Sequence, residues 1–182
     1  MPLSPVFPQQ ELREGDLAFR CGMGVFSRAV TSREENGIYS HVGILVKDGD
    51  QWKVVHAVPG EKASKADFDR VKAEDLSVFF HRDRATRGAL VHTSLTDSLK
   101  VAQIVSEALQ SARDSVLFDH DYSLEDSSRV YCTELVWRLY RRVGIDLAEG
   151  RGKNIHLLHI QGLCLLPEHL YDYSYNNPYF IF

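Results

Sequence analysis

The chain has 182 residues, a hydrophobic content of 44% and a formal net charge of −4. This length suits a single buried core, so we expect residues 1–182 to form one domain. The charge argues against nucleic acid as a partner, because phosphate binding requires a basic face or stripe and the sequence has neither.

The sequence leaves the cellular compartment open. No apolar run is long enough to span a membrane as a helix, so we expect no integral membrane segment. The amino terminus, MPLSPVFPQQ, lacks the basic and apolar segments of a signal peptide. A cytoplasmic protein and an envelope or periplasmic protein with a trimmed signal both fit this pattern, and the oligomeric state is equally undetermined.

The pattern of apolar residues predicts an α+β order of elements. In chain order we expect a strand at 13–20, a short helix at 22–30, a β-hairpin at 39–58, a charged loop or small helix at 61–75, strands at 76–81 and 90–93, an amphipathic helix at 94–112 capped by Thr96 or Asp97, a second helix from Tyr131 to Gly144, and an extended segment with Tyr171, Tyr173 and Tyr175 packed on the body.

The hairpin carries a histidine near each end. Its sequence is YSHVGILVKDGDQWKVVHAV, with Asp48-Gly49 as the turn signal. A two-residue turn places His41 directly opposite His56, and a four-residue turn makes them diagonal neighbours on the same face. Either way the two imidazoles lie side by side, as a functional pair or as two half-exposed structural histidines.

Cys132 is the one cysteine whose predicted position favours a reactive thiol. It lies in the first turn of the second helix, after Asp126, Ser127 and Ser128. The unpaired backbone N–H groups and the positive end of the helix dipole favour a thiolate there. Cys21 follows a strand and Cys164 lies in the apolar run GLCLL, so both are interpreted as core residues.

A cysteine at a helix N-terminus and a histidine pair on strands are the components of a papain-like cysteine hydrolase. Here the histidines precede the cysteine, which is the reverse of the order in papain. The chain is similar to circularly permuted papain-like cysteine hydrolases of the NlpC type, in particular the bacterial YiiX-like branch, which is related to the lecithin:retinol acyltransferase group. The resemblance rests on GDLAF (15–19), YSHVGI (39–44), VVHA (54–57), FDHDYS (118–123), YCTELVWRLY (131–140) and LLPEHLYDYS (165–174).

The resemblance implies an antiparallel sheet or small barrel packed against helices, with Cys132 as nucleophile, His41 as general base and His56 as the orienting residue. In the YiiX-like branch an acidic residue more often occupies the position of His56, and histidine takes this role in other relatives. A neutral imidazole at this position orients His41 but supplies no negative charge. The subfamily and the substrate therefore stay open.

The reaction implied is acyl transfer through a thioester, with the oxyanion bound by the Cys132 backbone N–H or a nearby donor. This scheme needs no cofactor and no metal, and His156 and His159 lack a metal-binding pattern. Three functions remain: hydrolysis of an amide in a small peptide, isopeptide or acyl-amide, with cell-wall peptides as one source; a lipid-directed thioesterase, phospholipase or acyltransferase; and a non-enzymatic binding module. The lack of a hydrophobic anchor favours amide hydrolysis.

Overall fold

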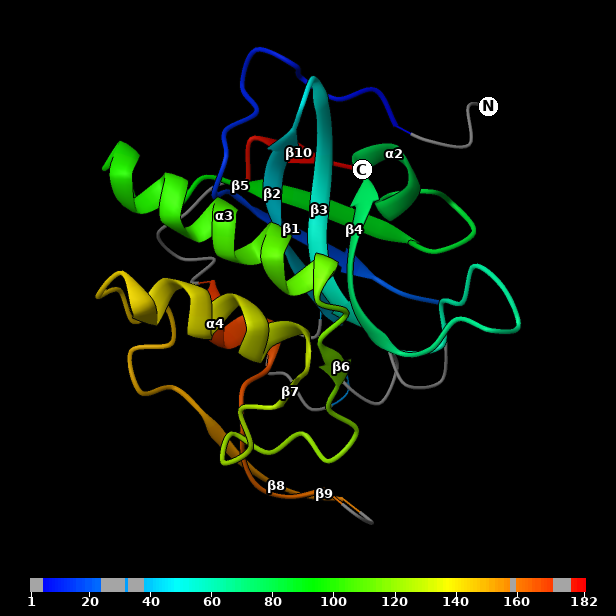
Figure 1. The fold of residues 1–182 in the computed structure, drawn as a ribbon, viewed down its shortest axis with the longest axis vertical. Coiled ribbons are helices and arrows are strands. Elements are labelled where there is room, and N and C mark those ends of the chain that lie inside the picture. Colours follow the sequence, from blue (N-terminus) through cyan, green and yellow to red (C-terminus); the bar gives the residue numbers. More distant parts are fainter. Residues whose placement is uncertain (1–4, 24–31, 33–37, 158–159, 172–177) are drawn as a thin grey trace.

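The computed structural model describes residues 5–23, 32, 38–157, 160–171 and 178–182. Its helices and strands form a mixed α/β fold (Figure 1). The strands are β1 (Leu17–Cys21), β2 (His41–Asp48), β3 (Gln51–Val58), β4 (Arg70–Asp75), β5 (Arg87–Val91), β6 (Leu117–Phe118), β7 (Arg129–Val130), β8 (Lys153–Leu157), β9 (Ile160–Cys164) and β10 (Phe180–Ile181). The helices are α2 (Leu76–Phe79), α3 (Ser98–Arg113), α4 (Cys132–Arg142) and α5 (Pro167–Leu170).

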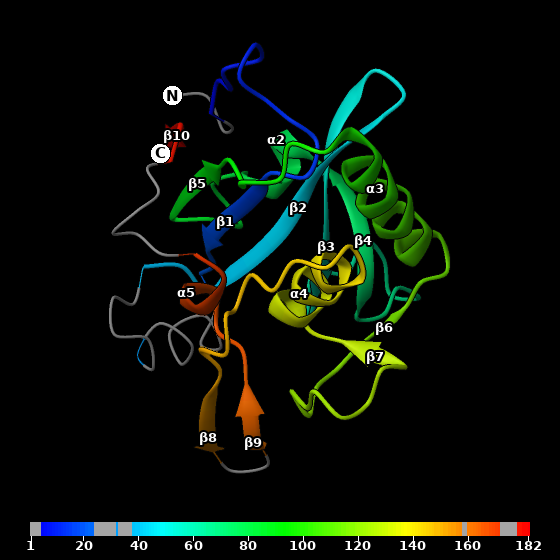
Figure 2. The same cartoon turned by 90° about the vertical axis from the view of Figure 1, so that its left-hand side faces the viewer.

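Eight of these strands form one sheet in the order β10-β5-β1-β2-β3-β4-β6-β7. All neighbouring pairs are antiparallel except β6 and β7, which are parallel. Strands β8 and β9 form a separate hairpin that projects from the body in Figure 2. The antiparallel sheet packed against helices confirms the predicted fold class.

Helices cover both faces of the sheet. On one face α3 and α4 lie across β2, β3 and β4, as Figures 1 and 2 both show. The other face is covered by α2 and by aromatic residues from both ends of the described chain. Alternation along β2 serves both layers, because Ile44 and Val46 belong to the core under α3 and α4 while Leu45 belongs to the core under α2.

The predicted hairpin is confirmed, and its register is the diagonal one, although the turn has two residues, because the tip lies one residue further along the chain than the expected Asp48-Gly49. Lys47 pairs with Trp52 and Asp48 with Gln51, so Gly49 and Asp50 form the tip. Gly49 has a φ of 63°, a conformation that glycine adopts without steric cost.

Two predictions for the segment after the hairpin were wrong. Residues 61–75 were expected to form a loop or small helix, but their last part is β4, in which buried Val71 alternates with polar residues paired to the neighbouring strand and loop. Residues 76–81 were expected to form a strand, yet Leu76–Phe79 is α2. Leu76, Phe79 and Phe80 all enter one core cluster, and their spacing of three and four suits a helix.

The two long helices form as predicted. The Asp97 side chain caps α3 by accepting hydrogen bonds from the backbone N–H groups of Leu99 and Lys100 at 3.0 and 3.2 Å. Helix α4 begins at Cys132, and Gly144, with a φ of 83°, follows its end. None of the described helices is both long enough and apolar enough to cross a membrane. Most of the helix expected at 22–30 lies outside the described residues, as do Tyr173 and Tyr175.

Candidate active site

Cys132 is the first residue of α4, and its position is fixed from both sides. The backbone N–H of the preceding residue, Tyr131, donates to the Glu134 carboxylate at 3.3 Å, which closes the first turn. The Tyr131 hydroxyl accepts a hydrogen bond from the Leu165 N–H at 2.9 Å. The Cys132 backbone N–H lies among the first N–H groups of the helix, which have no partner within the helix itself.

The Cys132 side chain is buried, with 8% of its surface exposed. Burial raises the pKa of the thiol above its ordinary value, although hydrogen bonds from Thr133 and from the backbone of Val42 act in the other direction. The expectation that the helix N-terminus yields a thiolate in the free protein was therefore wrong, because desolvation of the sulfur outweighs the helix dipole. The contact with Val42 also places the sulfur against the residue that follows His41.

The two hairpin histidines contact each other, as predicted. His41 Nε2 and His56 Nδ1 are 2.8 Å apart. The alternative of half-exposed histidines was wrong, since His41 is 7% exposed and His56 is completely buried. The ring of Phe79 from α2 packs against both imidazoles, with centroids 5.9 and 5.0 Å away. Burial is the largest cause that lowers the pKa of both histidines, so both rings are neutral at pH 7.

Gly43, in the SHVG segment, makes room for His56. A Cβ atom at Gly43 would lie 2.4 Å from Cγ1 of Val54 and 3.0 Å from Cβ of His56. A side chain there would therefore push β3, which carries His56, away from β2, which carries His41.

A carboxylate that the sequence did not single out completes the polar chain. Glu74 Oε2 lies 3.1 Å from His56 Nε2, on the ring nitrogen opposite to the one that contacts His41. His41, His56 and Glu74 thus form a diagonal line across β2, β3 and β4. The alternation of the charged Lys72 and Glu74 with the apolar Val71 and Ala73 was the available signal, and the high charge of the segment obscured it.

Two arginines and a second glutamate surround this chain. Arg84 Nη1 bonds to both Glu74 oxygens, at 2.9 and 3.0 Å, and to Glu61 at 2.9 Å. Glu61 also pairs with Arg20, which is 2% exposed and donates to the Phe79 carbonyl at 2.9 Å. Burial opposes ionisation of Glu74, but hydrogen bonds from His56 and Arg84 lower its pKa to about 2. Glu74 is therefore a carboxylate at neutral pH.

Cys132 and His41 line the same cavity, of about 340 Å³. Its lining combines the hydrophobic side chains of Val58, Pro59, Phe118 and Tyr122 with the charged residues Arg20, Glu61, Asp83 and Arg84, together with Gly22, Met23, Ser40 and Gly60.

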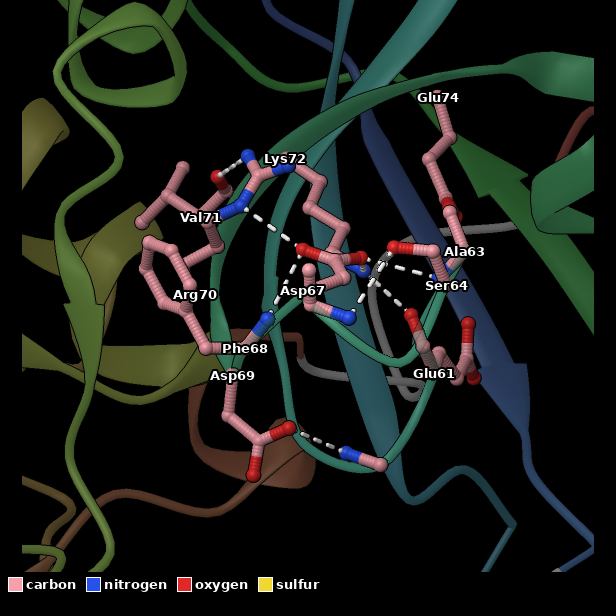
Figure 3. Close-up of polar contacts among 12 residues, drawn as sticks. Glu61, Ala63, Ser64, Asp67, Phe68, Asp69, Arg70, Val71, Lys72 and Glu74 are labelled. Carbon is pink, nitrogen blue, oxygen red and sulfur yellow. Dashed lines mark hydrogen bonds and ion pairs between the residues drawn. The ribbon is translucent and has the colours of Figure 1, made fainter.

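The loop between β3 and β4 forms one wall of this cavity, and Asp67 organises it (Figure 3). The Asp67 carboxylate accepts hydrogen bonds from the backbone N–H of Ala63 at 3.0 Å and from the Lys72 ammonium at 2.8 Å. Lys72 also donates to the Glu61 carbonyl. These contacts hold Glu61 beside the cavity.

Other residues of the motifs that carry the resemblance lie away from the cavity. Asp16 contacts His92 and Tyr179 at the far end of β1. Trp137 donates to Asp146, and Tyr140 is buried and bonds to the Gly15 carbonyl. Of the other cysteines, Cys164 is buried and Cys21 is partly exposed.

The antiparallel sheet, with a cysteine at a helix N-terminus and a histidine sharing one cavity, defines a papain-like class of protein. A family model of permuted papain-like amidases, the YaeF/YiiX or C92 family, matches residues 11–152. The chain belongs to this family, and the prediction of a permuted papain-like cysteine amidase is confirmed at this level.

The crystal structure of the metalloprotein yiiX from Escherichia coli O157:H7 is similar in fold, with a TM-score of 0.72 and 16% sequence identity, covering 91% of this chain and 95% of that one. No curated protein matches the sequence. Within the described part of this chain, no group of three or more His, Cys, Asp or Glu side chains could hold a metal ion.

Proposed function

We propose that the protein hydrolyses an amide bond of a small peptide, isopeptide or acyl-amide, with Cys132 as nucleophile, His41 as general base and His56 as the residue that orients His41. The observation that carries this proposal is the shared cavity: it holds the thiol and His41, and His41 bonds to His56 at 2.8 Å on the other side. Membership of the amidase family supports the reaction class.

The raised thiol pKa and the lowered His41 pKa describe a neutral pair before substrate binds. The thiol proton therefore moves to the free ring nitrogen of His41 as the sulfur attacks the carbonyl carbon. The carbonyl oxygen becomes an oxyanion, for which the Cys132 N–H is a candidate donor. Collapse breaks the C–N bond, and the leaving amine takes the proton from His41. Water, deprotonated by His41, then splits the thioester into an acid and free Cys132.

The lining of the cavity fits a small peptide. Charged side chains, Glu61, Asp83 and Arg84, lie along it and can bind the backbone or the termini of a peptide. The apolar side chains of Val58, Pro59 and Phe118 can contact the side chains of such a peptide. Cell-wall peptides are the first peptide substrates to test.

The test is a comparison of matched substrates. We would incubate the protein with cell-wall stem peptides, N-acyl anilides, the corresponding acyl esters and phosphatidylcholine vesicles, and follow the products by mass spectrometry. We expect turnover of amides and an acid-quenched acyl adduct on Cys132. Cys132→Ala should lower kcat by about 10³-fold or more.

Cys21→Ala is the matched control, because Cys21 is a partly exposed cysteine that does not line the cavity. This variant should retain turnover. Equal turnover by Cys132→Ala and the parent would reject the nucleophile. Turnover of esters or vesicles without any turnover of amides would reject the substrate class.

A further inference from the structure

Glu74, which is partly buried, lies at the end of a chain of three polar side chains that starts at the cavity with the buried His41 and His56. His41 lines the cavity, His56 bonds to His41, and Glu74 bonds to His56. Each contact joins diagonal neighbours on adjacent antiparallel strands, so the sheet itself sets the spacing. The described structure thus links the cavity to a carboxylate that does not line it.

The chemistry of the end group decides where the protons lie. Glu74 is ionised, and a carboxylate can only accept hydrogen bonds. His56 must therefore carry its proton on Nε2, which leaves Nδ1 of the neutral ring as an acceptor. His41 Nε2 must then donate to that acceptor, and His41 Nδ1 is left without a proton. One carboxylate thereby determines the tautomers of two imidazoles.

We propose that Glu74 is a positioning residue of the amidase: acting through His56, it holds His41 in the tautomer whose Nδ1 accepts the thiol proton. This inference rests on the proposed function, in which His41 is the base. It also answers the question raised by His56, because the negative charge that a histidine cannot supply at this position comes from β4 instead.

The same carboxylate stabilises the positive charge that forms on His41 during the reaction. Burial disfavours an imidazolium at His41, and so does the charge of Arg20. At His56, the charges of Glu74 and Glu61 oppose the effect of burial, whereas the charge of Arg20 adds to it. Two further cations, Arg84 and Lys72, bind Glu61 and so lie on the same side of the histidine pair. Arg84, by bonding both Glu74 oxygens, keeps Glu74 ionised and aimed at His56.

The first experiment reads the proton positions directly, without turnover. Two-bond ¹H–¹⁵N spectra of protein labelled at histidine distinguish a protonated from a bare ring nitrogen. We expect both His56 and His41 to carry the proton on Nε2 at neutral pH. A proton on His56 Nδ1 would reverse the direction of the chain and overturn the proposal, whether or not the protein proves to be an amidase.

The second experiment compares Glu74→Gln with the parent. The glutamine amide can donate as well as accept, so we expect mixed His56 tautomers and a kcat lower by about 10- to 100-fold, with an almost unchanged KM. Loss of the negative charge should also move the acid limb of kcat/KM to lower pH. Unchanged tautomers with unchanged kcat and pH profile would show that Glu74 only forms a structural ion pair with Arg84.

Glu107→Gln is the matched control. This substitution also breaks a Glu–Arg pair, because Glu107 bonds to Arg142 at 2.6 Å. That pair joins α3 to α4 on their exposed sides. We expect parent tautomers, kcat and pH profile in this variant. A drop in kcat equal to that of Glu74→Gln would overturn the proposal, because any lost ion pair would then explain the effect. Loss of activity in Cys132→Ala tests the proposed function separately.

Discussion

Two of the histidine–carboxylate contacts among the described residues can be compared directly, one next to the cavity-lining His41 and one at the far end of β1. His56 lies 3.1 Å from Glu74, and His92 lies 2.9 Å from Asp16. The first imidazole is fully buried and contacts a second histidine through its other nitrogen. The second is 32% exposed and stacks on Tyr179, with ring centroids 4.1 Å apart.

The pKa values of the two carboxylates shift in opposite directions, and their remaining partners differ. Glu74 is bonded by Arg84, and its pKa falls to about 2 although burial opposes this. Asp16 is bonded by the uncharged Tyr179 hydroxyl, and burial raises its pKa despite the contacts with His92 and Tyr179. At Glu74 the hydrogen bonds from His56 and Arg84 outweigh the effect of burial, whereas at Asp16 burial outweighs the contacts with His92 and Tyr179. Distance alone does not distinguish the chain from Glu74 through His56 to His41, which we call the relay, from the structural contact of His92 with Asp16.

The largest expected effect comes from breaking the relay where it meets the cavity. His41→Ala removes the only imidazole of the described residues that lines the cavity with Cys132, so we expect kcat to fall by about 10²- to 10⁴-fold. The measurement is steady-state turnover of the best amide substrate, with circular dichroism to verify folding. A folded His41→Ala protein with parental kcat would place the base elsewhere.

Glu134 is a third carboxylate whose pKa can be compared with those of Glu74 and Asp16. Its side chain is completely buried beside Arg138, and burial raises its pKa from 4.5 to about 7. Below pH 4.5 the group is neutral in both the folded and unfolded states, and above pH 7 the folded state bears the cost of an ionised carboxylate. Stability from this group is therefore lost as pH rises from 4.5 to 7, by about 3 kcal/mol.

Urea denaturation of Glu134→Gln and the parent at pH 4.5 and pH 8 measures this loss. The free energy of unfolding of the variant, relative to the parent, should rise by about 3 kcal/mol between the two pH values. Glu107→Gln is the control. The pKa of Glu107 is lowered, so the stability that its charge contributes is lost only as pH falls. The free energy of unfolding of this variant, relative to the parent, should therefore stay nearly constant above pH 5. A constant difference for Glu134→Gln would contradict the raised pKa.

The next substitution in order of expected effect tests whether the relay depends on the close packing of β2 against β3. Gly43→Ala places a Cβ 2.4 Å from Val54 Cγ1 and 2.9 Å from the Val55 carbonyl oxygen, and overpacking of this kind costs about 1 to 3 kcal/mol. Chemical denaturation measures this cost. We also expect lower kcat, because the shift moves His56 relative to His41. Parental stability and kcat would show that the strands yield without disturbing the pair.

Parts of the site could be predicted from local patterns. The period of two along the hairpin places His41 and His56 on one face for either even turn, and the start of the apolar helical pattern places Cys132 in the first turn. Glu74 could not be found in this way, because its contact with His56 joins two residues that lie 18 positions apart in the sequence. The direction of the shift in the Cys132 pKa was mispredicted for a related reason. A sequence reveals where the helix begins but not how deeply the sulfur is buried.

The short helix α2 shows the same limit for the fold. A run of five apolar and small residues fits a strand or a buried helix equally well, and length and flanking residues did not separate them. What selects the helix is the tertiary core, where Leu76, Phe79 and Phe80 share one cluster. This matters for the site, since the Phe79 ring packs on both histidines and under Arg20, with its centroid 4.5 Å from the guanidinium carbon.

The smallest expected effect on activity comes from the second carboxylate–imidazole pair. His92→Gln removes the ring stacked on Tyr179 and its contact with Asp16, at a cost of about 0.5 to 1.5 kcal/mol in stability. We expect kcat and KM within about twofold of the parent, because neither the partly exposed His92 nor its buried partner Asp16 lines the cavity that holds Cys132. His56→Gln is the matched substitution in the relay and should lower kcat strongly. Equal losses in the two variants would mean that any carboxylate-bound histidine affects turnover, and the specific role assigned to the chain from Glu74 through His56 to His41 would then fail.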